Sequence, residues 1–262
     1  MTARRKAFTL ALINAKGGVG KSTTAVNLAA GMVAAGRKVL LVDLDAQASA
    51  SLSLGVKRDE FLPGAAGVLF EGRPIRSAIL PTYVSGLDLL AGGAALASAD
   101  LVLGDVTGRE VALRAALAPV LGDYDAMILD CAPSFSLLTI NALTAAGSFL
   151  VPVTPDYLAL EGLVNLLAAV DRIRAGIGKC AALLGIVLTL ADYRLNVTAE
   201  IGAMIRRHWG RAVFKAEIRT NVKVKEAPSF GKTVFDYAGG SVGAYCYRQL
   251  TREVMARAGM TA

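Results

Sequence analysis

The sequence predicts a doubly wound α/β fold, in which a mostly parallel sheet is flanked by helices on both faces. Short apolar runs recur along the chain without polar alternation, which is typical of strands buried on both faces. Longer stretches with a helical spacing of apolar residues lie between these runs. Apolar residues make up 54% of the 262 residues, enough for one sizeable core, so we expect a single domain over residues 1–262.

The expected strands and helices alternate along the chain. Strands are predicted at 8–13, 39–42, 87–90, 126–129, 149–153 and 184–188. Helices are predicted at 21–35, 109–121, 136–146, 158–175, 198–209 and 241–258. Glycines within 31–36 and 176–178 indicate helix ends, and residues 55–110, rich in Gly, Ala and Pro, favour an insertion of loops and short helices.

Cysteine and histidine usage argues against two classes of site. Cys131, Cys180 and Cys246 are widely spaced, and His208 is the single histidine. Neither a disulfide scaffold nor a zinc site is expected from such a pattern.

The start of the chain resembles the basic head of a signal peptide, Met1–Lys6. The apolar run that follows, Phe8 to Ile13, is too short for a secretory core and favours a first strand. No stretch reaches the roughly 18 uninterrupted apolar residues that a membrane-spanning helix needs. We therefore expect a soluble, cytoplasmic protein.

Positive charge is concentrated in the last third of the chain. The formal net charge is +7, and from Leu190 onward twelve Lys and Arg stand against six Asp and Glu. Such asymmetry suggests an anionic partner, either nucleic acid or a membrane surface. A solvated basic face is the alternative that charge alone leaves open.

A glycine-rich loop follows the first predicted strand and leads into the first predicted helix. It runs Asn14-Ala15-Lys16-Gly17-Gly18-Val19-Gly20-Lys21-Ser22-Thr23. The backbone N–H groups of such a loop and the helix N-terminus bind phosphate, and glycines let the backbone approach it closely. Lys21 is expected to bridge the β- and γ-phosphates and Ser22 to hold Mg²⁺. The general pattern G-x-x-x-x-G-K-[ST] fails at Ala15, whereas K-G-G-x-G-K-[ST] fits.

Three aspartates lie at the ends of predicted strands. Asp130 follows an apolar run, where a carboxylate can hold Mg²⁺ through its water shell, although capping of the next turn is the alternative. Asp43 and Asp45 stand two residues apart, so both side chains are expected on one face of the strand. Like charges so close raise one pKa unless a cation lies between them, which indicates a Mg²⁺–nucleotide neighbourhood.

Further motifs follow the loop in order along nearly the whole chain. They are Val39–Gln47, Ile128–Ser134, Asn141–Leu143, Val151–Pro155, Asp192-x-Arg194 and Asn221–Ser229. Together with Lys16–Thr23 they resemble the ParA/MinD class of deviant Walker A P-loop ATPases, and within it the Soj-like ParA partition ATPases.

The resemblance implies a role for each site residue. The ATP-binding residues would be Lys16, Gly17, Gly18, Val19, Gly20, Lys21, Ser22, Thr23, Thr189 and Arg219, the last two near the adenine. The Mg²⁺ ligands would be Ser22, Asp45 and Asp130, and the catalytic residues Lys16, Lys21 and Asp45, with Asp45 positioning the attacking water. Arg219 stands where the family has proline, so stacking on the base and pointing to solvent are both open.

Lys16 has no evident task in its own loop, because Lys21 already serves the phosphates. A buried, unpaired ammonium would be costly. The resemblance implies that Lys16 reaches the phosphates of a second protomer across an ATP-sandwich homodimer, acting in trans as an arginine finger does. Loss of the γ-phosphate would then loosen the dimer.

The resemblance also gives the basic C-terminal third a partner. Family members bind DNA without sequence preference as ATP dimers, and Arg194 and Lys223 match positions of that kind. Lys225, Arg206 and Arg207 could extend the surface, since phosphate contacts by Lys and Arg are independent of sequence and sensitive to salt.

The implied function is a weak, Mg²⁺-dependent, partner-stimulated ATPase that associates with the nucleoid and positions a cargo. The cargo could be a plasmid or chromosome partition complex, chemoreceptors or carboxysomes, and the activator a ParB-like protein. A MinD-like membrane-associated regulator is the alternative, disfavoured because no additional amphipathic tail follows Arg257. A relative sharing an iron–sulfur cluster is disfavoured because Cys131 is expected to be a small buried residue.

Overall fold

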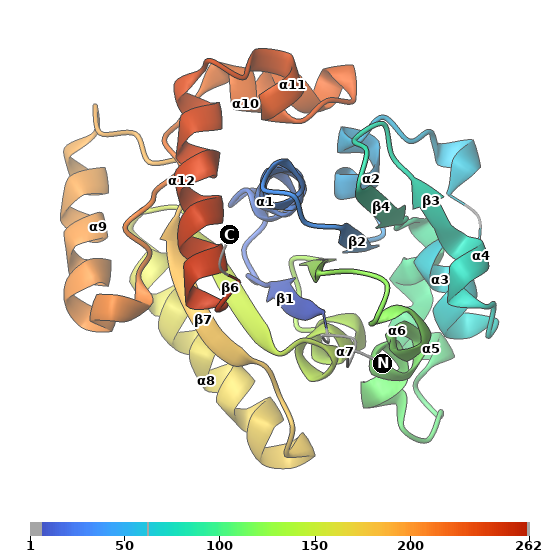
Figure 1. The fold of residues 1–262 in the computed structure, drawn as a ribbon. Coiled ribbons are helices and arrows are strands. Elements are labelled where there is room, and N and C mark those ends of the chain that lie inside the picture. The colour runs from blue at the N-terminus through green and yellow to red at the C-terminus, as the bar shows by residue number, and fades with distance from the viewer. Residues whose placement is uncertain (1–6, 62, 261–262) are drawn as a thin grey trace.

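The computed structural model describes residues 7–61 and 63–260. They form a seven-stranded sheet with the order β3-β4-β2-β5-β1-β6-β7 (Figure 1). The strands are β1 Phe8–Leu12, β2 Val39–Leu44, β3 Ile79–Pro81, β4 Leu87–Leu90, β5 Ala126–Cys131, β6 Ser148–Val153 and β7 Ala182–Leu188. Neighbouring strands are parallel except β3 and β4, which are antiparallel, so the predicted doubly wound, mostly parallel α/β class is confirmed.

Helices cover both faces of the sheet. They are α1 Lys21–Ala34, α2 Ser49–Ser53, α3 Gly64–Phe70, α4 Ile75–Ala78, α5 Ala99–Val102, α6 Ala112–Leu117, α7 Leu137–Ala145, α8 Ala159–Ile177, α9 Asn196–Trp209, α10 Val222–Glu226, α11 Val234–Ala238 and α12 Val242–Arg257. The apolar side chains of α1 and α12 share one core layer with one side of the sheet. Those of α6, α7, α8 and α9 share the other layer. The fold is therefore a three-layer sandwich (Figure 1).

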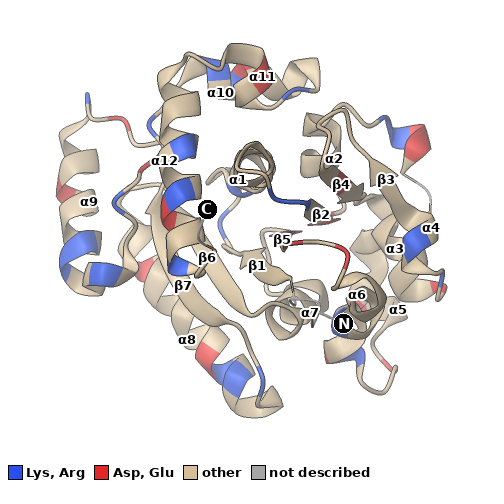
Figure 2. Ribbon diagram, in the orientation of Figure 1, with Lys and Arg blue, Asp and Glu red and all other residues tan. Residues whose placement is uncertain are grey.

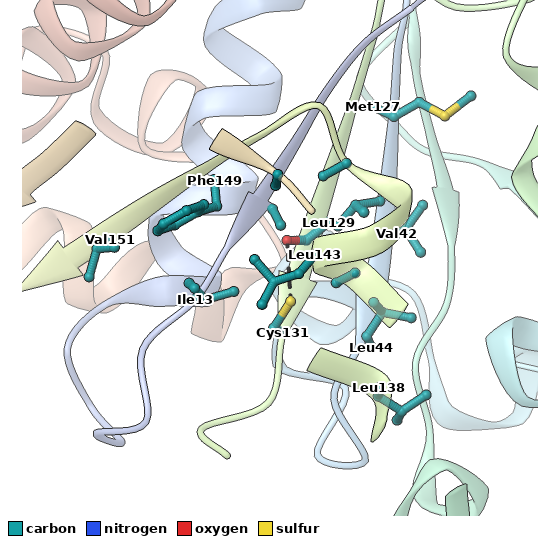
Figure 3. Packing of buried hydrophobic residues seen from close by; sticks show 14 of the residues in the cluster. Ile13, Val42, Leu44, Met127, Leu129, Cys131, Leu138, Leu143, Phe149 and Val151 are labelled. Atoms are coloured by element: carbon teal, nitrogen blue, oxygen red, sulfur yellow. Dashed lines mark hydrogen bonds between the residues drawn. The ribbon is translucent and has the colours of Figure 1, made fainter. Parts of the chain in front are cut away.

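The central strands owe their position to continuous apolar sequence. Every residue of β2 and β5 is buried, as expected for strands covered on both faces. Figure 3 shows Cys131 at the end of β5 near Ile13 and Leu143, and all three belong to one buried apolar cluster. Cys131 is 1% exposed, so the prediction of a small buried residue is confirmed. Burial raises the pKa of its thiol well above the ordinary value, which keeps it protonated.

The predicted helix over 109–121 was wrong in its continuity. The segment contains a 3₁₀ turn at Arg109–Val111, α6 at Ala112–Leu117 and a second 3₁₀ turn at Ala118–Val120. Asn141 of α7 donates from Nδ2 to the Arg109 carbonyl at 2.7 Å and accepts from the Leu113 N–H at 3.0 Å, which diverts backbone groups that a longer helix would use. Pro119 supplies no N–H at the other end.

The strand β3 departs from the prediction, whereas the end of α1 agrees with it. The strand β3 was not predicted within the loop-rich segment 55–110; it is three residues long and ends in Pro81 at the sheet edge, where proline is tolerated. Gly31 lies in the last turn of α1, which ends at Ala34, so the helix end predicted within 31–36 is confirmed. A Cβ at Gly31 would stand 2.3 Å from Thr251 Oγ1, so glycine allows α12 to pack closely on α1.

The ends of the chain lie outside the described residues, including the basic start Met1–Lys6 and Thr261–Ala262. Within the described ranges, none of the helices combines the length and the apolar composition needed to cross a bilayer.

Candidate nucleotide-binding site

The glycine-rich loop connects β1 to α1 at the carboxyl edge of the sheet. Gly18 and Gly20 adopt φ of 73° and 81°, a left-handed conformation that favours glycine. The Asn14 side chain holds the start of the loop, donating to the Pro152 carbonyl at 2.7 Å and accepting from the Lys16 N–H at 2.9 Å. A Cβ at Gly17 or Gly18 would meet no other atom within 4 Å, so the space above the loop is open to a ligand.

The two lysines of the loop lie in different environments. Lys21 is 6% exposed and donates from Nζ to the Lys16 carbonyl at 3.1 Å. Burial lowers the pKa of Lys21, and the carboxylate of Asp130 opposes that effect. Lys16 instead forms an ion pair with Asp156, beyond the end of β6, and its side chain is 48% exposed. Lys21 therefore points into the site and Lys16 away from it.

Asp130 fits a magnesium site. It is fully buried, and neither carboxylate oxygen has a hydrogen-bond partner within the described part of the chain. Burial raises its pKa well above the ordinary value, and the neighbouring Asp43 adds to the effect, while Ser22 and Lys21 oppose it. A buried carboxylate with unsatisfied oxygens beside a hydroxyl is a donor set suited to a hard cation such as Mg²⁺.

Asp43 and Asp45 lie close together but differ in burial and in hydrogen bonding. Asp43 lies within β2, fully buried, and accepts hydrogen bonds from the Ser51 hydroxyl at 2.7 Å, the Ser51 N–H at 2.9 Å and the Asp45 N–H at 3.0 Å. Asp45 lies one residue beyond β2, where strand alternation no longer applies, and is partly exposed. Burial, more than the charge of Asp45, raises the pKa of Asp43 to about 6.

A cavity of about 380 Å³ opens over the loop. Its lining residues are Gly17, Gly18, Gly20, Lys21, Ser22, Thr23, Asp45, Ser49, Pro133, Leu190 and Lys225. Most of the predicted phosphate and metal residues therefore meet in one place. Thr189 lies beneath the loop rather than in the cavity, because it is 1% exposed and donates from Oγ1 to the Val19 carbonyl at 2.8 Å.

Arg219 does not line this cavity. Its guanidinium lies 3.5 Å from Glu217 and 5.5 Å from the centre of the Tyr193 ring. It lines a separate cavity of about 440 Å³ beside α12. The structure thus does not bring Arg219 to the phosphate loop, and its contact with adenine stays a prediction.

The predicted DNA-binding residues differ in how they are paired. Arg194 pairs with Asp192 at 2.5 Å, and Lys223 pairs with Glu226 at 2.9 Å, although both basic side chains stay more than half exposed. Arg206 donates to the Phe214 carbonyl at 2.8 Å and supports the chain beyond α9. Arg207 is exposed. Figure 2 shows Lys and Arg along α9, α10 and α12.

Two contributors to the site were missed from the sequence. Asp156 is 140 residues from its ion-pair partner Lys16, and no local pattern marks it. Ser51 is buried and links Asp43 to the Gly92 N–H, which it contacts at 3.1 Å. A turn and the start of α2 lie between Asp43 and Ser51, so the sequence pattern did not indicate the hydrogen bonds between them.

Comparisons with known proteins show which family this chain resembles over its length. A family model described as an AAA domain matches residues 7–180. The chromosome-partitioning ATPase Soj of Thermus thermophilus is 44% identical over 97% of this chain and 98% of its own length. The chromosome partitioning protein ParA of Caulobacter vibrioides is 39% identical over 95% of this chain and 94% of its own.

A solved structure extends the comparison to a bound ligand. Cobyrinic acid a,c-diamide synthase from Mycobacterium smegmatis, with bound ADP and magnesium, superposes with a TM-score of 0.81 at 32% identity, covering 94% of this chain and 93% of its own. McdA from Cyanothece, solved as the ATP complex of a single-residue variant, shares the fold with a TM-score of 0.87 at 20% identity over 98% of both chains. Because this chain is 39–44% identical to Soj and ParA proteins over nearly its full length, it belongs to the family of Soj/ParA chromosome-partitioning ATPases.

Proposed function

We propose that this protein is a Mg²⁺-dependent ATPase of one domain that dimerises around ATP, binds DNA without sequence preference and positions a cargo. The observation that carries the proposal is that the two lysines of one loop point in different directions. Lys21 lines the cavity, whereas Lys16 does not, and Lys16 is held outward and half exposed. An outward cation beside a phosphate site is available to a second protomer.

The residues of the cavity divide the work of hydrolysis. The loop N–H groups and Lys21 would bind and orient the phosphates. Ser22 and Asp45, with the buried Asp130 that does not itself line the cavity, would hold Mg²⁺, which neutralises charge on the transferring phosphoryl group. Asp45, partly exposed beside Ser49 and Pro133, would orient the attacking water. The Gln47 N–H donates to its Oδ1 at 2.9 Å, which leaves its other carboxylate oxygen for that water.

The partners follow from charge and from the relatives. The basic side chains of α9 and α10, with Arg194 between β7 and α9, offer phosphate contacts, and dimerisation doubles their number. Because Lys16 would contact the nucleotide of the partner protomer, dimerisation and the doubled number of phosphate contacts would depend on ATP. We propose a ParB-like or cargo-bound activator and a place on the nucleoid, because Soj and ParA are chromosome-partitioning proteins.

The test is DNA binding as a function of nucleotide. Duplexes of unrelated sequence are titrated with the protein in Mg-ATP, in Mg-ADP and without nucleotide, at several salt concentrations, with Arg194→Ala as the variant. Binding only in Mg-ATP, equal for all duplexes, weaker in salt and weaker in the variant, is the expected result. Equal binding in all three states contradicts the proposal, and so does binding to anionic vesicles with no binding to DNA.

A further inference from the structure

One basic residue of the last third lies at the nucleotide cavity instead of on the outer surface. Lys225 lines the cavity together with Asp45, Pro133 and Leu190. Its ammonium group forms no ion pair or hydrogen bond in the described part of the chain, and the residue is exposed. Hydrogen bonds from Arg194 lower the pKa of the nearby Asp192 and the charge of Lys225 adds to that effect, but no carboxylate is within ion-pair distance of the Lys225 ammonium group in the described residues. A cation that lies beside a phosphate-binding loop without a direct ion pair is a feature that a bound anion would complete.

The position of Lys225 is fixed by well-anchored backbone. The Asn221 side chain caps α10 by accepting from the N–H groups of Lys223 and Val224. Val224 is 5% exposed and packs so closely on α12 that a Cβ at Gly243 would stand 2.3 Å from it. The short helix is therefore held against α12, and Lys225 extends from a fixed base.

Lys223 and Lys225 point in different directions although both are on α10. Successive helical residues are rotated by about 100°, so residues two apart lie on nearly opposite sides. Lys223 pairs with Glu226 at 2.9 Å and lies 5.6 Å from the centre of the Tyr237 ring, and it does not line the cavity. The two lysines are a matched pair, one turned to the nucleotide cavity and one turned from it.

The sheet order indicates which part of a nucleotide Lys225 faces. The loop follows β1, with β5 and β2 on one side and β6 and β7 on the other. Asp45 and Pro133 follow β2 and β5, so the hydrolysing end of the nucleotide belongs on that side. Leu190, which follows β7, and Lys225 form the opposite wall. There the α-phosphate and ribose would lie.

We propose that Lys225 binds the α-phosphate side of the bound nucleotide, and so determines affinity for nucleoside di- and triphosphates alike. The inference deepens the proposed function, since it rests on nucleotide binding at this loop. It removes Lys225 from the group of purely DNA-facing residues. Because the α-phosphate is present before and after hydrolysis, the contact would persist in both states.

The test is calorimetric titration of the full chain with Mg-ADP and with Mg²⁺ plus a slowly hydrolysed ATP analogue, without DNA. Lys225→Ala is expected to weaken both ligands by about fivefold, with the loss shrinking at high salt. Lys225→Arg is expected to restore affinity, and Lys223→Ala to stay within about twofold of the wild type. Thermal unfolding of each variant without nucleotide shows whether α10 is intact.

Several outcomes would overturn the inference. These are unchanged affinity in Lys225→Ala, a loss confined to the ATP analogue, or an equal loss in Lys223→Ala. The Mg-ADP arm requires neither dimerisation nor DNA, so failure here is distinct from failure of the proposed function. Conversely, a wild-type protein that binds nucleotide but never DNA would refute the proposed function, and the inference that Lys225 binds nucleotide would be unaffected.

Discussion

The ion pair between Lys16 and Asp156 is predicted to weaken the ATP-dependent dimer, that is, to raise its dissociation constant. If Lys16 serves the partner's nucleotide, each protomer must break this pair before the dimer closes. Asp156→Asn keeps the shape of the side chain and removes the charge that holds Lys16. The variant is therefore expected to dimerise more tightly than the wild type in the presence of ATP.

The magnitude follows from exposure. The side chains of Lys16 and Asp156 are 48% and 37% exposed, so solvent screens the pair and it stabilises the free protomer by only about 0.5–1 kcal/mol. A symmetric dimer breaks two such pairs, which together correspond to about a 5- to 30-fold fall in the dimer dissociation constant. So weak a pair can orient Lys16 in the free protomer and still break when Lys16 moves to the nucleotide of the partner protomer.

Analytical ultracentrifugation with a slowly hydrolysed ATP analogue measures that constant. Asp171→Asn is the matched control, because Asp171 pairs with Arg174 on α8 at 2.7 Å and is also exposed. The control is expected to dimerise as the wild type does. An Asp156→Asn variant that dimerises no better than the control would refute the reasoning that this pair competes with the dimer.

Two further predictions concern packing and the loop. Gly31→Ala should lower the free energy of unfolding by about 1–3 kcal/mol, because the new Cβ would stand 2.3 Å from Thr251 Oγ1. Gly162→Ala on α8 is the control and should not lower it, because its Cβ would meet no atom within 4 Å. Urea denaturation followed by circular dichroism compares the two variants, and equal stability would contradict the packing argument. Thr189→Val removes the 2.8 Å hydrogen bond to the Val19 carbonyl and should weaken Mg-ADP binding about fivefold by calorimetry; wild-type affinity would mean that Thr189 does not hold the loop.

The sequence was most informative where structure depends on neighbouring residues. The loop from Lys16 to Thr23 was predicted because glycines, an apolar run and a helical segment follow one another directly. Asp130 was predicted because it ends a buried strand. The strand bounds were close for the same reason, since central parallel strands are continuous apolar runs.

Contacts between distant segments were beyond the sequence pattern. Asp156 meets Lys16 across 140 positions, and Asn141 ends the helical pattern near Arg109 from another helix. The different directions of Lys223 and Lys225 depend on how α10 is fixed to α12. Arg219 faces α12 because Glu217 and Tyr193 hold it there, which composition could not indicate.

The central claim is that ATP joins two protomers into the DNA-binding form. Asp45→Ala should retain ATP, because Asp45 is proposed to position water and not to hold the phosphates. Light scattering of this variant measures its mass in Mg-ATP, in Mg-ADP and with duplex DNA. The account predicts twice the protomer mass of 27.2 kDa in Mg-ATP, stable on DNA, and a single protomer in Mg-ADP. A single protomer in Mg-ATP that binds DNA equally well would contradict it.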